Sequence, residues 1–273
     1  MRTALRAVRS AGGGAFVALG TILGKAGAQV LLSMHRRERV AMPPPAQVDG
    51  HTFDVVADLV DFTALPETIV VAMLRRRLES HRVEWHLFPR RARSEHWFYR
   101  ASRAYLFANA IHDSRELAAE FALLVPPGGR VLDFGGGTGN LTLCLAARAI
   151  DVDYLELSAL QKEFVRYRVH KHGLSERVTV LDDWIPLRSA HYDLLCAFDV
   201  LEHLPNLDEE LAGRLLPSLK ADAVIAELSP FVTNLSNPMH FEDAYDLRRM
   251  LAEAGFQLES SSEDRRIWRR TIH

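Results

Sequence analysis

The decapeptide VLDFGGGTGN, residues 131–140, constrains the fold of this chain more than any other stretch. It begins with an apolar run that fits a buried strand ending near Asp133, and an apolar helical pattern follows Asn140. The glycines between them tolerate positive φ and let a ligand approach the backbone closely. The pattern therefore predicts a strand, a ligand-binding loop and a helix in succession.

The spacing of the glycines distinguishes two classes of cofactor. A dinucleotide fingerprint has the order G-x-G-x-x-G, but the sixth position counted from Gly135 is Asn140. The sequence instead reads D-x-G-x-G-x-G from Asp133. This order favours a nucleoside cofactor without a pyrophosphate. An NAD(P)-dependent oxidoreductase on a Rossmann-like sheet remains the alternative, and Asn140 argues against it.

Two acidic positions follow the glycine loop at the spacing of successive strands. Glu156 lies 23 residues beyond Asp133, at the end of the next apolar run. A carboxylate there can accept hydrogen bonds from the hydroxyls of a ribose. After the third run, Asp183 is expected to accept from an adenine amino group, and Trp184 or Ile185 to stack on the ring. These residues together predict a binding site for an adenosine-containing cofactor.

Beyond residue 112, short apolar runs alternate with amphipathic helical patterns, which is typical of an α/β fold with a doubly wound sheet. Strands are expected at residues 130–134, 151–157, 177–182, 192–198, 223–229, 256–261 and 265–271. The last two are too close in sequence for a crossover helix, which favours an antiparallel hairpin. The predicted fold is a seven-stranded, mostly parallel, Rossmann-like sheet with a C-terminal antiparallel hairpin and an N-terminal helical subdomain.

Three segments are expected along the chain. Residues 1–50 comprise a basic, apolar N-terminal segment and a polar, Pro-rich linker that includes Pro43-Pro44-Pro45. Residues 51–112 carry apolar side chains at helical spacing and are expected to form a helical lid or substrate subdomain. Residues 113–273 are expected to form the cofactor-binding domain.

The first 40 residues admit several interpretations. Arg2, Arg6 and Arg9 precede an apolar stretch that is too short to span a membrane before Lys25 interrupts it. The segment could be a targeting presequence, an amphipathic anchor on a membrane surface, or a helix packed on the protein. The second interpretation would make the protein peripheral to a membrane.

The composition, 48% hydrophobic and 25% charged, is that of a globular protein. Cys144 and Cys196 both lie in apolar runs, so no disulfide framework is expected, and a reducing cytoplasm is the expected location. Residues 1–112 hold 16 Lys/Arg against 9 Asp/Glu, whereas the remainder holds 17 against 26. No nucleic-acid-binding motif accompanies the basic part, so a nucleic-acid partner is not expected.

Four pieces of the sequence, in order, resemble the class I S-adenosylmethionine-dependent methyltransferase family: VLDFGGGTGN, the acidic end of VDYLEL, the DDW turn and YDLLCAFDVLEHLPN. The resemblance covers the chain from about Arg115 to the C-terminus and implies S-adenosyl-L-methionine as cofactor. It implies that Asp133 and the loop hold the methionine end, Glu156 the ribose, and Asp183 with Trp184 the adenine. The full set of expected cofactor-binding residues is Asp133, Gly135, Gly137, Gly139, Glu156, Leu157, Asp183, Trp184 and Asp199.

The segment FDVLEHL, residues 198–204, follows the fourth strand, where cofactor and substrate usually meet in this family. Methyl transfer is an in-line displacement on a sulfonium, so the protein mainly aligns the acceptor and removes its proton. Asp199, Glu202 and His203 are the candidate catalytic residues. His203 suits a general base near neutral pH, although the same letters also occur in the family simply as a helix start.

A metal site is a second hypothesis for the same segment. Asp199-x-x-Glu202-His203 is similar to the E-x-x-E-H motif of ubiquinone-pathway O-methyltransferases, which is associated with a divalent metal. Two carboxylates and an imidazole can bind one ion, so Asp199, Glu202 and His203 are the metal ligands if a metal is present. His240 or Glu227 could supply a fourth ligand.

The leading functional hypothesis is methyl transfer from S-adenosyl-L-methionine to an O or N atom of a small-molecule acceptor, such as a natural product or a quinone-like compound. A non-catalytic partner protein that keeps the cofactor fold and is tethered to a membrane is a further alternative. Aromatic residues between Trp97 and Phe107 could line the acceptor pocket, but their helical spacing favours a core. Arg100, Arg103 and His112 could hold an anionic group of the acceptor or be solvated.

Overall fold

The computed structural model describes residues 42–77, 80–81, 84–85, 97–112, 114–182, 186–231, 240–241, 246–262 and 265–271. The first 40 residues lie outside the described residues, so their interpretations stay predictions. The expected adenine-binding pair, Asp183 and Trp184, also lies outside them. Within the described part, no helix has the length and apolar character needed to cross a membrane.

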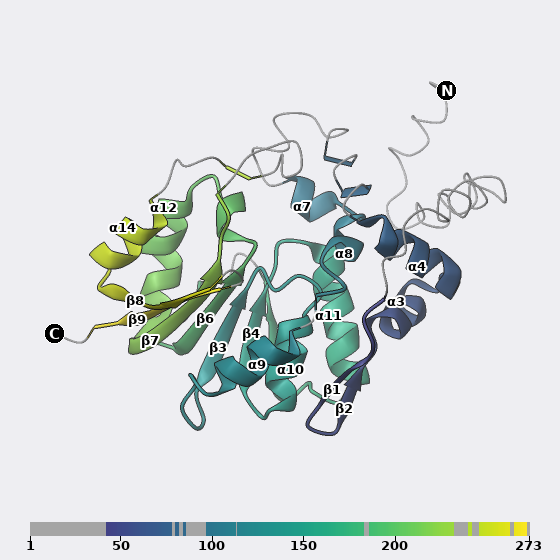
Figure 1. Cartoon of the computed structure of the whole chain (residues 1–273), viewed down its shortest axis with the longest axis horizontal. Coiled ribbons are helices and arrows are strands. Elements are labelled where there is room, and N and C mark those ends of the chain that lie inside the picture. Colours follow the sequence, from purple (N-terminus) through teal and green to yellow (C-terminus); the bar gives the residue numbers. More distant parts are fainter. Residues whose placement is uncertain are drawn as a thin grey trace.

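A seven-stranded sheet forms the centre of the molecule (Figure 1), with strand order β5-β4-β3-β6-β7-β9-β8. The strands are β3 (Arg130–Phe134), β4 (Asp151–Leu155), β5 (Val178–Leu181), β6 (Tyr192–Phe198), β7 (Leu219–Leu228), β8 (Phe256–Ser261) and β9 (Arg266–Arg270). The first five are parallel to their neighbours, whereas β9 pairs antiparallel with both β7 and β8. The predicted fold class and the C-terminal hairpin are confirmed.

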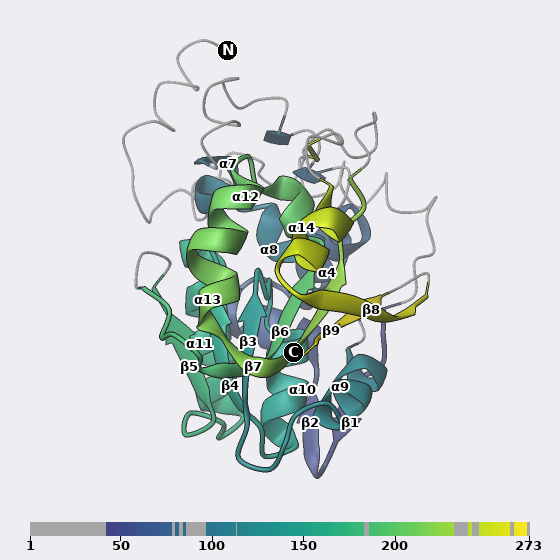
Figure 2. The same cartoon turned by 90° about the vertical axis from the view of Figure 1, so that its left-hand side faces the viewer.

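Both faces of the sheet are buried, which explains the nearly continuous apolar runs. In β3, Val131 belongs to one hydrophobic cluster and Leu132 to the other. Figures 1 and 2 show the helices of the two layers on opposite faces. The first layer contains α9 (Arg115–Ala122), α10 (Asn140–Ala147) and α11 (Ala159–Lys171), and the second contains α12 (Leu207–Glu210), the π-helical turn η3 (Leu211–Leu215), α13 (Leu216–Ser218) and α14 (Leu247–Glu253).

The residues expected as a polar linker contain a strand instead. β1 (Ala46–Val48) and β2 (His51–Phe53) form an antiparallel hairpin whose turn is Asp49-Gly50, with φ angles of 42° and 84°. Asp-Gly between two short runs is a strong signal for such a hairpin, and the interpretation as linker overlooked it. Val48 and Phe53 are buried in the same hydrophobic cluster as Val131. This segment is therefore part of the core, while the expected domain boundaries stay a prediction.

The helices of the expected N-terminal subdomain pack against the sheet layer. They are α3 (Val55–Thr63), α4 (Glu67–Arg75), α7 (Trp97–Ala101) and α8 (Tyr105–Ala108). Asp54 caps α3 because its side chain accepts hydrogen bonds from the backbone of Val56 and Ala57. Leu59 of α3 and Phe107 of α8 share a hydrophobic cluster with Phe164 of α11. The helical segment thus packs on α11 through this cluster.

A buried charged cluster joins the helical segment to the glycine loop. Arg168 of α11 is 1% exposed, and its guanidinium donates to the Asp58 carboxylate of α3 at 2.8 Å. The same group donates to the carbonyl of Thr138 and to the side chain of Asn140, both at 2.7 Å. Burial alone would raise the pKa of Asp58, but hydrogen bonding from His172 and the charge of Arg168 outweigh it and lower the pKa. Asp58 is therefore ionised and paired.

We expect Arg168→Met to destabilise the protein by about 3 to 5 kcal/mol. The variant leaves the Thr138 carbonyl and the Asn140 side-chain oxygen without their donor, and it leaves Asp58 with Lys171 and His172 alone. Arg177→Met is the matched control, since the Arg177 pair with Asp151 is partly exposed and should contribute at most about 1 kcal/mol. The measurement is the free energy of unfolding in urea. Equal losses in the two variants would contradict a structural role for the Arg168 cluster.

Candidate functional site

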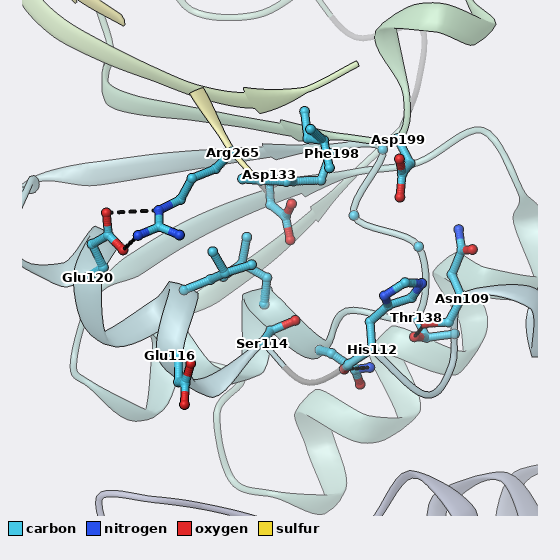
Figure 3. Close-up of a pocket in the computed structure, with 17 residues that line it drawn as sticks. Asn109, His112, Ser114, Glu116, Glu120, Asp133, Thr138, Phe198, Asp199 and Arg265 are labelled. Atoms are coloured by element: carbon cyan, nitrogen blue, oxygen red, sulfur yellow. Dashed lines mark hydrogen bonds and ion pairs between the residues drawn. The ribbon is translucent and has the colours of Figure 1, made fainter. Parts of the chain in front are cut away.

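A cleft of about 410 Å³ lies at the carboxyl ends of β3, β6 and β7 (Figure 3). One wall is made by the glycine loop with Asn109, His112 and Ser114, and the other by Phe198, Asp199 and Leu228 at the strand ends. The carboxylates of Asp133 and Asp199 both point into the cleft in Figure 3. In this fold class, ligands usually bind at the carboxyl ends of the parallel strands, at the point where the strand order reverses.

The glycines of the loop have different structural roles. At Gly137, φ is 55° and an added Cβ would meet only Asn109, at 3.6 Å, so the backbone is open to the cleft. At Gly139, φ is 74° and an added Cβ would lie 2.8 Å from Cγ2 of the buried Val165. Gly139 is therefore required for packing between the loop and α11. Gly135 lines the cleft and Gly139 does not.

Asp133 is at the end of β3 and is only 4% exposed, although it lines the cleft. Its Oδ2 accepts a hydrogen bond from the hydroxyl of Thr142 in α10. Burial raises its pKa to about 6, and the hydrogen bond opposes this shift only in part. Asp133 is therefore a carboxylate that gains or loses its charge just below neutral pH.

Glu156 follows β4 and is 4% exposed. Its Oε1 accepts from the backbone N–H of Leu157 at 2.7 Å and of Ser158 at 3.1 Å, and its Oε2 accepts from Gly137 at 3.2 Å. Burial raises its pKa despite these bonds. A carboxylate has about four acceptor positions, so one remains on Oε2. Glu156 and Leu157 lie beside the glycine loop but do not line the cleft.

Backbone carbonyls of the segment that precedes α9 accept hydrogen bonds from side chains at the starts of α10 and α11. The amide of Asn140 donates to the carbonyls of Ala110 and His112, both at 2.9 Å, and its oxygen accepts from Arg168. Gln161 donates to the carbonyl of Tyr105 at 3.0 Å. These bonds place Asn109 and His112 on the cleft wall, and they give Asn140 a structural role at the position where a dinucleotide site has glycine.

The cleft is acidic. Its lining includes the carboxylates of Glu116 and Glu120 from α9 besides those of Asp133 and Asp199. Arg265 is the guanidinium in this lining, and it pairs with Glu120 through bonds of 3.0 and 2.6 Å. The sequence analysis missed the two glutamates and Arg265. The four-residue spacing of Glu116 and Glu120, which puts them on one face of a helix, was the available signal.

The three candidate catalytic residues are exposed to different extents. Asp199 has a left-handed backbone, with φ of 49°, and its exposed side chain lines the cleft. Desolvation raises its pKa, while His112 and His240 partly counter this shift. Glu202 and His203 belong to the 3-10 helix η2 (Leu201–His203) and do not line the cleft. Burial raises the pKa of the fully buried Glu202 to about 9.

His203 meets residues that lie far away in the sequence. Its Nδ1 is 2.8 Å from the hydroxyl of Tyr99 in α7, and its ring is 4.7 Å from that of His240, at an angle of 80°. In the part of the chain that the structure describes, one group of three side chains brings metal-ligating atoms within 4.8 Å of one another, namely Glu202, His203 and His240.

This group shares Glu202 and His203 with the ligand set expected from the sequence. His240, which was expected as a possible fourth ligand, lies beside them, whereas Asp199 lines the cleft. Glu227 is not available as a further ligand, since both of its oxygens accept from Arg266 and Oε1 also accepts from Trp268. The charged pair at the end of β7 is therefore structural.

The aromatic residues of α7 and α8 belong mainly to the core. Phe98, Tyr99, Tyr105 and Phe107 are all less than 9% exposed, and they pack edge to face or through the clusters beside α11. The side chain of Trp97 is outside the described residues. Of the residues expected to hold an anionic group, His112 lines the cleft, whereas Arg100 and Arg103 do not.

Comparisons with known proteins agree with this geometry. Residues 103–261 match a sequence family described as a methyltransferase domain. The chain is 36% identical over 94 residues to the mitochondrial ribosomal RNA small subunit methyltransferase of Arabidopsis thaliana, which covers 34% of this chain and 23% of that protein. It is 33% identical over 99 residues to the sarcosine/dimethylglycine N-methyltransferase of Aphanothece halophytica. This alignment covers 34% of this chain and 36% of that protein. The alignments thus span about a quarter and a third of these relatives.

Among solved structures, the mitomycin 7-O-methyltransferase MmcR is similar in fold. The superposition covers 80% of this chain and 72% of that protein, with a TM-score of 0.50 and 18% sequence identity. At this level of identity the likeness concerns the fold alone.

We expect Gly139→Ala to lower stability more than Gly137→Ala. Both place alanine at a positive φ, which costs roughly 1 to 2 kcal/mol. Only Gly139→Ala also pushes a methyl group into Val165, which adds roughly 1 to 3 kcal/mol. Urea unfolding of both variants measures the difference, and equal losses would show that the loop relaxes around the added methyl.

Proposed function

The chain belongs to the methyltransferase domain family, and we propose that it transfers the methyl group of S-adenosylmethionine to an oxygen or nitrogen atom of a small-molecule acceptor. The observation that carries the proposal is the acidic cleft beside the glycine loop, where Asp133 and Asp199 face the same space. Carboxylates stabilise a sulfonium cation electrostatically, and they disfavour the phosphates of a dinucleotide.

In this proposal the cofactor lies along the carboxyl ends of β3 and β4. Asp133, Gly135 and the open backbone of Gly137 hold the methionine end. The remaining acceptor position of Glu156 receives one ribose hydroxyl. Leu157 packs beside the ribose. Asp183 and Trp184 are proposed to hold the adenine from the resemblance to the family. Gly139 contributes by positioning the loop on α11.

The charge and size of the cleft support a small acceptor over a nucleic acid. A polynucleotide brings closely spaced phosphates, which Lys and Arg side chains normally neutralise. Here four carboxylates line a cleft of about 410 Å³, and Arg265 is already paired with Glu120. The similarities to a sarcosine/dimethylglycine N-methyltransferase and to a ribosomal RNA methyltransferase each cover 34% of the chain, so they do not decide between the two classes of acceptor. The proposal of a small acceptor rests on the charge and size of the cleft.

We assign the proton-accepting role to Asp199. The sequence favoured His203 as the base, but Asp199 lines the cleft and has a raised pKa, which strengthens it as a base. His203 and Glu202 lie behind the cleft wall. The reaction is an in-line displacement: the acceptor lone pair forms the new bond to the methyl carbon, the carbon–sulfur bond breaks, and the acceptor proton passes to Asp199.

The purified full chain is expected to bind S-adenosylmethionine and its demethylated product, S-adenosylhomocysteine, in calorimetric titrations. Glu156→Ala should weaken both, because it removes the proposed ribose acceptor and the anchor for the N–H of Gly137. Glu163→Ala, an exposed position on α11, is the control and should leave binding unchanged. No detectable cofactor binding by the wild-type chain, or tight binding of NAD(H) at the same site, would reject the proposal.

The affinity for S-adenosylhomocysteine should rise between about pH 5 and pH 7, by up to about tenfold. Asp133 has a pKa of about 6, so it is neutral at the lower end of this range and anionic at the upper end, where it can accept from the cofactor ammonium. Asp133→Asn should flatten the profile. A variant that keeps the wild-type pH dependence would show that another group controls it.

A further inference from the structure

We propose that Glu202, His203 and His240 form a binding site for one divalent transition-metal ion, behind the wall of the cleft. Their ligand atoms lie within 4.8 Å of one another, and they come from two loops that follow the adjacent parallel strands β6 and β7. Ligand atoms on one ion are about 3 to 4 Å apart, so the side chains need to close by about an ångström.

The buried carboxylate of Glu202 supplies the first argument. The residue is fully buried, and neither of its side-chain oxygens has a hydrogen-bond partner. Native proteins rarely leave such a group unsatisfied, because its desolvation is costly without a compensating bond. The carbonyl of Glu202 accepts from the backbone of Phe241, which fixes the two loops against each other. A cation bound by the side chain would satisfy both oxygens.

The hydrogen bonds of the two imidazoles supply the second argument. Nδ1 of His240 is 2.8 Å from the carbonyl oxygen of Pro230. A carbonyl can only accept, so Nδ1 carries the proton and the lone pair lies on Nε2. Nδ1 of His203 is bonded to the hydroxyl of Tyr99 at 2.8 Å, which can accept in the same way. Imidazole ligands of metals usually donate their other nitrogen to an oxygen, as His240 does here and as the contact of His203 with Tyr99 allows.

The donor set indicates the kind of ion. Two imidazoles and one carboxylate suit Zn²⁺, Fe²⁺ or another transition metal, whereas Mg²⁺ and Ca²⁺ prefer sites made wholly of oxygen. Three protein ligands leave at least one coordination position for water or another oxygen ligand, which is typical of reactive rather than purely structural sites. His240 also influences the pKa of Asp199, so the ion would lie within electrostatic reach of the cleft.

The test uses the full chain, purified without chelator or affinity-tag metal, with metal content measured by mass spectrometry and Zn²⁺ affinity by competition with a chromogenic chelator. The wild-type chain is expected to bind one Zn²⁺, whereas Glu202→Gln and His240→Ala should bind at least about tenfold more weakly. Glu163→Gln and His170→Ala are the matched controls, because both side chains are exposed on α11, and they should bind as the wild type does.

A second measurement separates lost ligands from lost structure. Zn²⁺ should raise the unfolding temperature of the wild-type chain and of both controls, but not that of Glu202→Gln, which keeps the shape of the side chain. Tyr99→Phe should weaken Zn²⁺ binding while leaving one site. Failure of the wild type to bind Zn²⁺ or Fe²⁺, or unchanged affinity in the Glu202 and His240 variants, would overturn the inference. Cofactor binding is measured separately, so the proposed function and this inference can fail independently.

Discussion

The buried guanidinium of Arg168 is the interaction on which the geometry of the cleft depends. It satisfies the Thr138 carbonyl and the Asn140 side chain of the glycine loop, and it neutralises Asp58 of α3. Without this guanidinium the Thr138 carbonyl and the Asn140 side-chain oxygen would lose their donor, and Asp58 would keep only Lys171 and His172 as partners. The loop, α3 and α11 therefore form one rigid unit, and Asn140 extends it to the carbonyls of Ala110 and His112.

The fold and the surroundings of the glycine loop could be predicted from the sequence because they depend on local features. Val131 and Leu132 enter opposite cores, so the strand needs apolar residues at every position and is visible as a run. The glycine loop follows it directly, and Glu156 is placed by the parallel pairing of β3 with β4. Local sequence fixes each of these features, because the residues involved are consecutive or one crossover apart.

The parts of the site that the sequence did not reveal all depend on contacts between distant residues. The cleft wall from Glu116 and Glu120 requires α9 to pack beside α10 and against Phe198 of β6, and Arg265 reaches it from the far end of the chain. Likewise, nothing in the letters around His240 shows that it meets His203, since 37 positions and strand β7 separate them. The left-handed backbone of Asp199, with φ of 49°, is likewise a feature that residue type alone does not determine.

The segment after β6 divides its acidic residues between two environments. Asp199 is turned by its left-handed backbone toward the cleft, where solvent and the proposed cationic cofactor can stabilise its charge. Glu202, one turn later, is fully buried, and neither of its side-chain oxygens has a hydrogen-bond partner among the described residues. Glu227 lies nearby, and its charge is compensated by the guanidinium of Arg266, whereas burial raises the pKa of Glu202, which has no such partner. Since two imidazole rings face that carboxylate, a bound cation is the compensation that the local chemistry favours.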